Sequence, residues 1–158
     1  THDPIGGYRH PDHIAAHNAA VEAFKAVSDP SRYPEAGPAY QPAKLYFHVM
    51  PHRLLKLAVR LMPVFGRNPR KFGRNGDIDL TPLVATDFPV HVVLKLSDEE
   101  EAVHREAIRC HASQLGGDPP RRGILGVINR FTGPRDCYMR AYPPASRRLH
   151  EKDLFQGV

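Results

Sequence analysis

The chain has 158 residues, which is enough for one domain with a sizeable core and too short for two comfortable ones. Its apolar share of 41% and charged share of 25% are typical of a globular protein, and no apolar run approaches the ~20 residues needed to cross a bilayer. The net charge of +5 permits an anionic partner without requiring one. We therefore treat 1–158 as a single domain.

The first elements along the chain are a loop and a helix. Residues 1–9 contain two turn-forming dipeptides and predict a loop. A helix is expected from about Pro11 to Val27, because proline suits the first helical position and Asp12 places a negative charge at the positive end of the helix dipole. The segment 29–43 contains four prolines and predicts an extended connection.

The middle of the chain predicts strands that alternate with amphipathic helices. Residues 44–50 and 89–96 are short, β-branched or aromatic runs bounded by breakers, which is typical of strands. Residues 51–61 have the apolar spacing of a helix. A second helix is expected from Asp98 to about Gln114, since 97–100 form a Ser-x-x-Glu capping box.

The last part of the chain gives weaker signals. Residues 77–80 predict a short helical or extended piece, 124–131 a short helix and 136–142 an edge strand. The polar, proline-flanked segment 143–158 predicts a loose tail. Together the elements indicate an α/β architecture with chemistry at the carboxyl ends of strands. So few strands would make a small sheet, and we expect that part of the fold lies outside this chain.

One short stretch concentrates chemistry. His10, Asp12 and His13 straddle the expected start of the first helix, so two imidazoles and a carboxylate converge. Such a group suits either a metal site or acid–base catalysis, because a carboxylate can fix the tautomer of an imidazole. The plain alternative is a helix cap at His10 with surface histidines behind it. The zinc-protease motif HExxH is excluded, because Ile14 stands where its glutamate would be.

The flanks make the stretch more specific. The string DPIGGYRHPDHIAAH, residues 3–17, resembles the second motif of the PIG-L/LmbE family of zinc-dependent deacetylases. The string AIRCHASQ, residues 107–114, is similar to a later helix of that family. The resemblance implies a Rossmann-like fold of three layers, sheet and helices. It also implies hydrolysis of an N-acyl group, typically acetyl, on an N-acetylglucosamine-type amino sugar or its conjugate.

The resemblance also implies roles for individual residues. His13 would be a zinc ligand. His10 would stabilise the oxyanion and protonate the leaving amine, with Asp12 orienting and tuning its imidazole. Tyr8 matches a tyrosine that hydrogen-bonds the substrate carbonyl. Arg9 stands where a glycine is usual, which would crowd the rim or add an anion contact.

One family motif has no counterpart here. The string His-Pro-Asp-Asp, which supplies two further zinc ligands and the general base, does not occur in this sequence. A catalytic zinc takes three protein ligands and an open position, so His13 alone cannot hold it. We expect these residues to be the C-terminal part of a deacetylase domain that depends on an N-terminal segment or another chain.

A basic segment allows a different function. Seven Lys or Arg and no acidic residue lie between Arg53 and Arg74. The segment predicts a solvated face, a peripheral contact with anionic membrane, or a nucleic-acid contact. The lack of tryptophan and of a recognisable motif argues against nucleic acid. The alternative to the enzyme is a non-catalytic binding or scaffold domain with an incomplete site.

The two cysteines bear on compartment. Cys110 and Cys137 are far apart and show no metal-type spacing, so they do not predict a disulfide framework or a cysteine metal site. Reduced thiols favour a cytoplasmic location.

Overall fold

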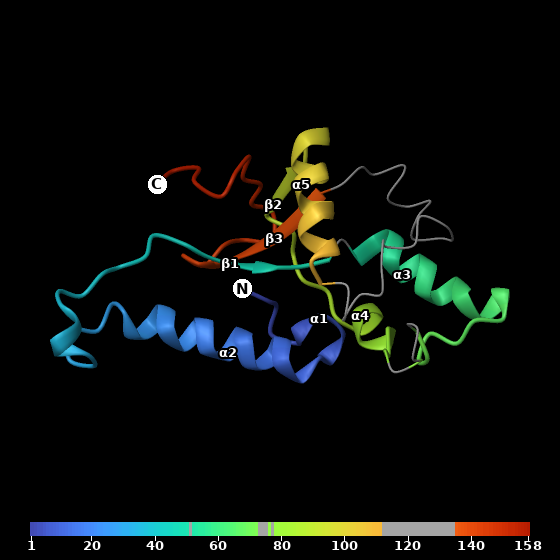
Figure 1. Cartoon of the computed structure of the whole chain (residues 1–158), viewed down its shortest axis with the longest axis horizontal. Coiled ribbons are helices and arrows are strands. Elements are labelled where there is room, and N and C mark those ends of the chain that lie inside the picture. The colour runs from blue at the N-terminus through green and yellow to red at the C-terminus, as the bar shows by residue number, and fades with distance from the viewer. Residues whose placement is uncertain (51, 73–75, 77, 112–134) are drawn as a thin grey trace.

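The structure is a computed structural model that describes residues 1–50, 52–72, 76, 78–111 and 135–158. Helices and strands alternate along it, in agreement with the predicted α/β class (Figure 1). In chain order the elements are α1 (Gly6–Arg9), α2 (Pro11–Ala26), the 3-10 turn η1 (Pro34–Ala36), β1 (Leu45–His48), α3 (His52–Leu61), the 3-10 turn η2 (Met62–Phe65), α4 (Thr81–Ala85), β2 (Val92–Lys95), α5 (Asp98–Arg109) and β3 (Arg135–Tyr142).

The sheet has three strands in the order β1-β3-β2. Both outer strands pair with β3 in the antiparallel sense, with His48 and Val92 each opposite Tyr138. Strand β3 is therefore central, and the prediction of an edge strand over 136–142 was wrong. Its local alternation of polar and apolar residues is the same in either place, so the pattern could not distinguish them.

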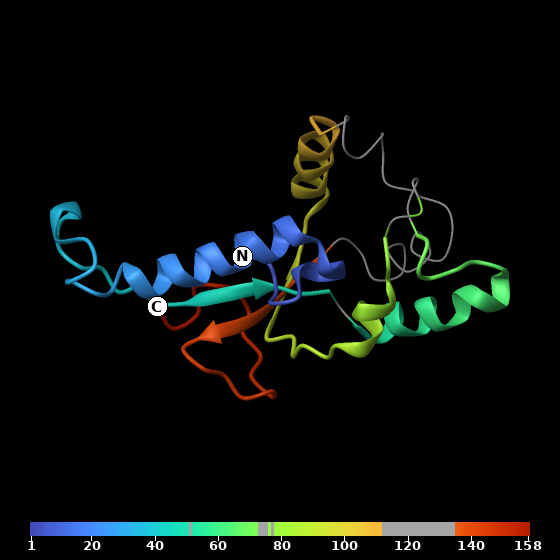
Figure 2. The same cartoon turned by 90° about the horizontal axis from the view of Figure 1, so that it is seen from below.

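The main core lies between the sheet and α2. Phe47, Val49 and Cys137 are buried together, and Val21 of α2 packs against them. Helix α2 runs along the sheet in both views (Figures 1 and 2). A second, smaller core joins Val59, Met62 and Leu80, which brings α3 and η2 against the start of α4.

The two long helices, α2 and α5, begin where the local sequence signals predicted. Pro11 and Ala26 bound α2, and the predicted capping box of α5 is present, with the Ser97 hydroxyl accepting from the Glu100 N–H at 3.2 Å. Helix α5 ends at Arg109, and α4 is an element that was not predicted. The predicted helix over 124–131 lies outside the described residues. No helix of the described chain is both long and apolar enough to span a membrane.

The final segment is anchored to the sheet, which differs from the predicted loose tail. Glu151 is buried, and its Oε1 lies 2.9 Å from Lys44 Nζ and 2.8 Å from a terminal nitrogen of Arg140. Its Oε2 accepts from the Tyr46 hydroxyl at 2.8 Å. A buried carboxylate needs such partners, and it fixes the segment over the face of the sheet opposite α2.

Candidate active site

The backbone before α2 is a tight turn organised by Asp3. Its buried carboxylate accepts hydrogen bonds from the backbone N–H of Ile5 at 2.9 Å and of Gly7 at 3.0 Å. Gly6 has φ of +61°, and a Cβ there would lie 2.8 Å from a side-chain carbon of Ile14. The turn therefore needs glycine at Gly6 for both conformation and space, and Asp3 is a site-building residue that sequence reasoning missed.

Arg9 closes the same turn in a strained conformation. Its φ is +68°, in the left-handed region that glycine adopts readily and other residues avoid. The arginine therefore occupies a place whose backbone favours glycine.

The turn brings the predicted site residues together. The Tyr8 ring meets the rings of His10 and His13 edge-on, each at a centroid distance of 5.6 Å. The His10 and His13 rings are 4.7 Å apart and tilted by 33°. His2, which sequence reasoning did not select, stacks on His13 at 4.2 Å. We call Tyr8, His10, His13 and His2 the histidine cluster; all four are partly exposed.

His10 is also the cap of α2. Its Nδ1 accepts a hydrogen bond from the backbone N–H of Asp12 at 3.2 Å. An Nδ1 that accepts leaves the proton of the neutral ring on Nε2, which is then free to donate to a substrate. The Asp12 carboxylate lies 4.0 Å from the same Nδ1 and is 87% exposed, so it does not hydrogen-bond His10 in this conformation.

His17 has a structural place. It is buried, its Nδ1 lies 2.8 Å from the carbonyl oxygen of His2, and its ring packs edge-on against Phe47 at 4.7 Å. His13, one helical turn earlier, is partly exposed, and both histidines contact His2: His13 through its ring and His17 through the backbone carbonyl.

The surroundings of His2 favour its neutral imidazole. Burial, followed by the neighbouring His13 and His48, lowers the pKa of His2 below its usual value. A neutral ring at His2 avoids repulsion with the ring stacked on it. The N-terminal end of the 16-residue helix α2 adds partial positive charge at the same place, which suits a developing negative charge on a substrate.

A complete metal site is not formed by the described residues. They contain no group of three or more His, Cys, Asp or Glu side chains that could hold a metal ion. The rings of His2 and His13 are parallel within 2°. Because nitrogen lone pairs lie in the ring plane, one ion cannot lie in two stacked parallel planes at once. His13 and His2 therefore cannot share one ion in this arrangement.

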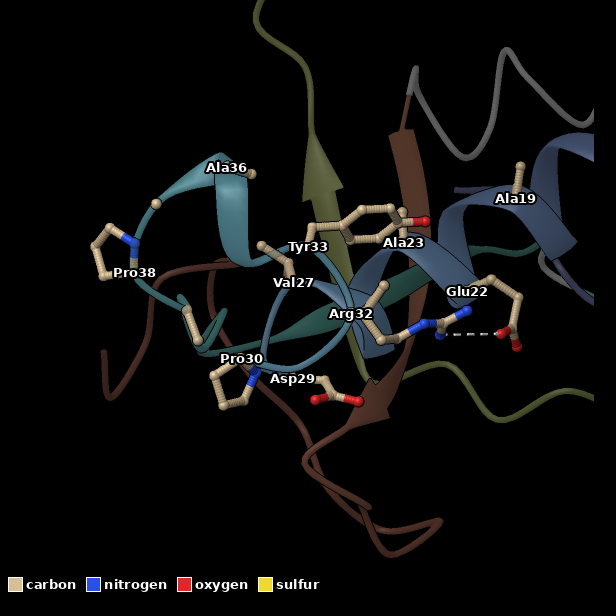
Figure 3. A pocket seen from close by; sticks show the side chains of 13 residues that line it. Ala19, Glu22, Ala23, Val27, Asp29, Pro30, Arg32, Tyr33, Ala36 and Pro38 are labelled. Carbon is tan, nitrogen blue, oxygen red and sulfur yellow. Dashed lines mark ion pairs between the residues drawn. The ribbon is translucent and has the colours of Figure 1, made fainter.

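A pocket of about 460 Å³ lies at the other end of α2 (Figure 3). It is closed on one side by the segment that carries Tyr33, whose neighbour Arg32 pairs with Glu22 at 3.9 Å. Its lining is mostly alanine and proline. A 16-residue helix is about 24 Å long, so this pocket is remote from the histidine cluster and brings no catalytic side chain to it.

Comparison with known proteins points to one kind of chemistry. The chain is 48% identical over 171 residues to the 1D-myo-inositol 2-acetamido-2-deoxy-alpha-D-glucopyranoside deacetylase 1 of Frankia casuarinae, with 100% of this chain and 52% of the relative covered. It is 48% identical over 170 residues to the mycothiol S-conjugate amidase of Streptomyces coelicolor, covering 54% of it. A deacetylase of the first name from Nocardioides sp. is 34% identical, with 53% covered. These relatives are named as hydrolytic enzymes.

The extent of the match is uniform. The chain is covered in full by each of these three comparisons, and it spans about half the length of the relatives that it matches. No family model matches the chain. The similarity therefore includes the histidine cluster.

Proposed function

We propose that the chain carries part of the active site of an N-deacetylase of the PIG-L/LmbE family, acting on an N-acetylglucosamine-type sugar or its conjugate. The observation that supports this most is the convergence of Tyr8, His10 and His13 on one exposed point at the start of α2. The names of the relatives supply the reaction class and the type of substrate. The proposal includes the family's three-layer, Rossmann-like fold for the complete protein.

The residues of this chain would bind and polarise the amide. The Nε2–H of neutral His10 can donate to the carbonyl oxygen as negative charge develops there. The Tyr8 hydroxyl, whose ring lies beside both imidazoles, can donate to the same oxygen. The N-terminal end of α2 would stabilise the charge further. The exposed Asp12 carboxylate lies 4.0 Å from His10 Nδ1, and it would orient the ring when Nδ1 also carries a proton, as in the imidazolium.

The proposal includes a zinc ion, for which this chain would supply one ligand. His13 would supply one ligand, and further ligands would come from residues other than those described. When bound, zinc would supply Lewis-acid polarisation of the amide carbonyl.

The test compares two histidines in the complete, zinc-loaded enzyme. His13→Ala should lose most of the bound zinc, because it removes a ligand. His10→Ala should keep the zinc and lower turnover by about 100-fold or more, as expected for loss of an oxyanion donor. His104→Ala, an exposed histidine on α5, serves as the matched control. Metal analysis and single-turnover assays give the two readouts, and unchanged zinc and activity in His13→Ala would sink the assignment.

A second candidate is a binding role at the basic segment, which a specific observation favours. Leu57, Val64 and Phe65 of α3 and η2 are 54%, 76% and 70% exposed, although all are apolar. Four exposed basic residues lie near them in the sequence: Arg60, Arg67, Arg70 and Lys71. Exposed apolar side chains in a basic segment suit the surface of an anionic membrane. This contact is compatible with the enzyme and would place it beside a lipid surface.

A further inference from the structure

Three polar side chains gather at the carboxyl end of β1, where the proposed chemistry does not use them. His48 ends β1, and Asp136 and Tyr138 lie on the adjacent strand β3. His48 and Asp136 are 47% and 35% exposed. Within the described part of the chain, His48 is the one polar partner found for the Asp136 carboxylate. We call His48, Asp136 and Tyr138 the strand-end triad.

The spacing of the triad leaves room for a bridging atom. His48 Nε2 lies 3.7 Å from Asp136 Oδ1, beyond the usual length of a direct hydrogen bond. An oxygen about 2.8 Å from both atoms fits this gap, since hydroxyl hydrogen bonds have that length. A hydroxyl there would donate to the carboxylate and accept from the imidazole N–H, which uses both of its capacities.

Tyr138 completes the triad. Its ring meets the His48 ring edge-on at 5.5 Å. Burial, followed by the neighbouring Asp136 carboxylate, raises the pKa of Tyr138. Its phenol therefore stays protonated, and its hydroxyl can donate one hydrogen bond and accept another.

The triad lies beside the histidine cluster. His2 forms an isolated parallel bridge with His48, so the two backbones lie about 5 Å apart, as neighbouring strands do. The His2 ring in turn stacks on His13 at 4.2 Å. His2 thus lies between the triad and His13, so that one elongated substrate could reach both.

The chemistry of the triad narrows the class of ligand. An anion such as phosphate would be repelled by Asp136. A metal ion is not favoured, because no described group of three possible ligands exists. A neutral hydroxyl suits a carboxylate acceptor, an imidazole and a phenol, and a ring with adjacent hydroxyls could place one of them between His48 and Asp136.

We propose that His48, Asp136 and Tyr138 form a subsite for the hydroxyl groups of a cyclic polyol, so that the polyol part of the substrate is held beside the histidine cluster. The link to a substrate rests on the proposed function, whereas polyol binding itself does not.

The test is a titration of the 158-residue chain with myo-inositol, followed by NMR of the imidazole carbon-bound protons. Resonances of His48 should shift saturably, and cyclohexanol, which has one hydroxyl, should cause no such shift. Asp136→Asn and His48→Gln should each weaken inositol binding by about tenfold or more, because each removes a hydrogen bond that involves a charged or polar partner. Asp98→Asn and His104→Gln, exposed positions on α5, are matched controls and should bind as the unaltered chain does.

Three results would each overturn the subsite: no saturable shift at His48, an equal response to cyclohexanol, or unchanged binding in both triad variants. Amide spectra of the variants report whether each remains folded, and either variant suffices if the other does not fold. Saturable binding without deacetylation by the complete enzyme would count against the proposed function alone, and turnover without the inositol response would count against the subsite alone.

Discussion

At the residue scale, Arg9 is the clearest case of strain near the site. It has a φ of +68°, which costs a non-glycine residue about 1 kcal/mol or more. Arg9→Gly should raise the free energy of unfolding by about 0.5–1 kcal/mol, since the greater entropy of the unfolded glycine chain offsets part of the gain. Urea denaturation measures the change.

A second variant separates strain from charge. Hydrogen bonds from Thr81, and to a smaller degree the charge of Arg9, lower the pKa of Asp79, so Arg9 also acts electrostatically. Arg9→Ala removes the charge and keeps the strain, so its stability should stay near that of the unaltered chain. Equal stability of the glycine and alanine variants would contradict the strain argument.

The buried carboxylate of Glu151 gives a pH dependence at the same scale. Burial alone would raise its pKa, but hydrogen bonds from Lys44 and Tyr46 and the charge of Arg140 outweigh burial and lower it. A pKa lowered by folding stabilises the native state above the unfolded value of 4.5, and this stability is lost as the pH falls through the folded value.

Replacing that carboxylate should therefore be costly at neutral pH. Glu151→Gln leaves two largely buried cations, Lys44 and Arg140, without a counter-charge and should lower the free energy of unfolding by about 3 kcal/mol at pH 7. The difference from the unaltered chain should begin to shrink as the pH falls below the unfolded value of 4.5, and it should be lost as the pH falls through the lower folded value, where Glu151 becomes protonated in the native state as well. Urea titrations at pH 7 and pH 4 test this, with the exposed Glu99→Gln as control; a pH-independent difference would contradict it.

At the scale of elements, the predictions from sequence succeeded where the signal was local. Helix α2 and the capped helix α5 follow from proline, capping residues and periodicity within a few positions. The central place of β3 and the anchoring of Glu151 depend on pairing between distant segments, with Lys44 and Glu151 107 positions apart. Such pairing is a property of topology, which no local pattern encodes.

The candidate site shows the same difference between local signals and long-range pairing. Tyr8, His10 and His13 lie within one short turn of the chain, so one motif predicted them together. The additional groups, His2, His48 and Asp136, reach that place only because strands align, and they have no spacing that could have been recognised. The parallel bridge between His2 and His48 is the signal that joins the two sets.

The segment α3–η2 carries an element-scale prediction. If its exposed apolar side chains enter an anionic membrane surface, Phe65→Ser should weaken binding to phosphatidylglycerol vesicles by about tenfold or more, because one buried phenyl group contributes roughly 2 kcal/mol. Vesicle flotation measures the binding, and binding should fall as salt rises.

The chain offers a matched control for this variant. Phe155 is 79% exposed but lies in the C-terminal segment, so Phe155→Ser should leave flotation unchanged. Equal flotation with phosphatidylcholine vesicles, or an equal effect of both substitutions, would contradict the membrane contact. Salt-sensitive retention on nucleic acid without flotation would instead support the alternative partner.

At the scale of the whole molecule, the proposed function would have the histidine cluster supply one zinc ligand, through His13, whereas a catalytic zinc needs three. The 158-residue chain alone should therefore retain far less than one zinc ion per molecule after dialysis. Joined to the part of the Streptomyces coelicolor relative that the similarity leaves out, it should retain about one, because that arrangement would complete the ligand set. Metal analysis by mass spectrometry compares the two preparations.

His13→Ala in the joined protein is the control that assigns the ion to this site. Stoichiometric zinc in the chain alone, or zinc that survives His13→Ala in the joined protein, would show that the metal is held elsewhere.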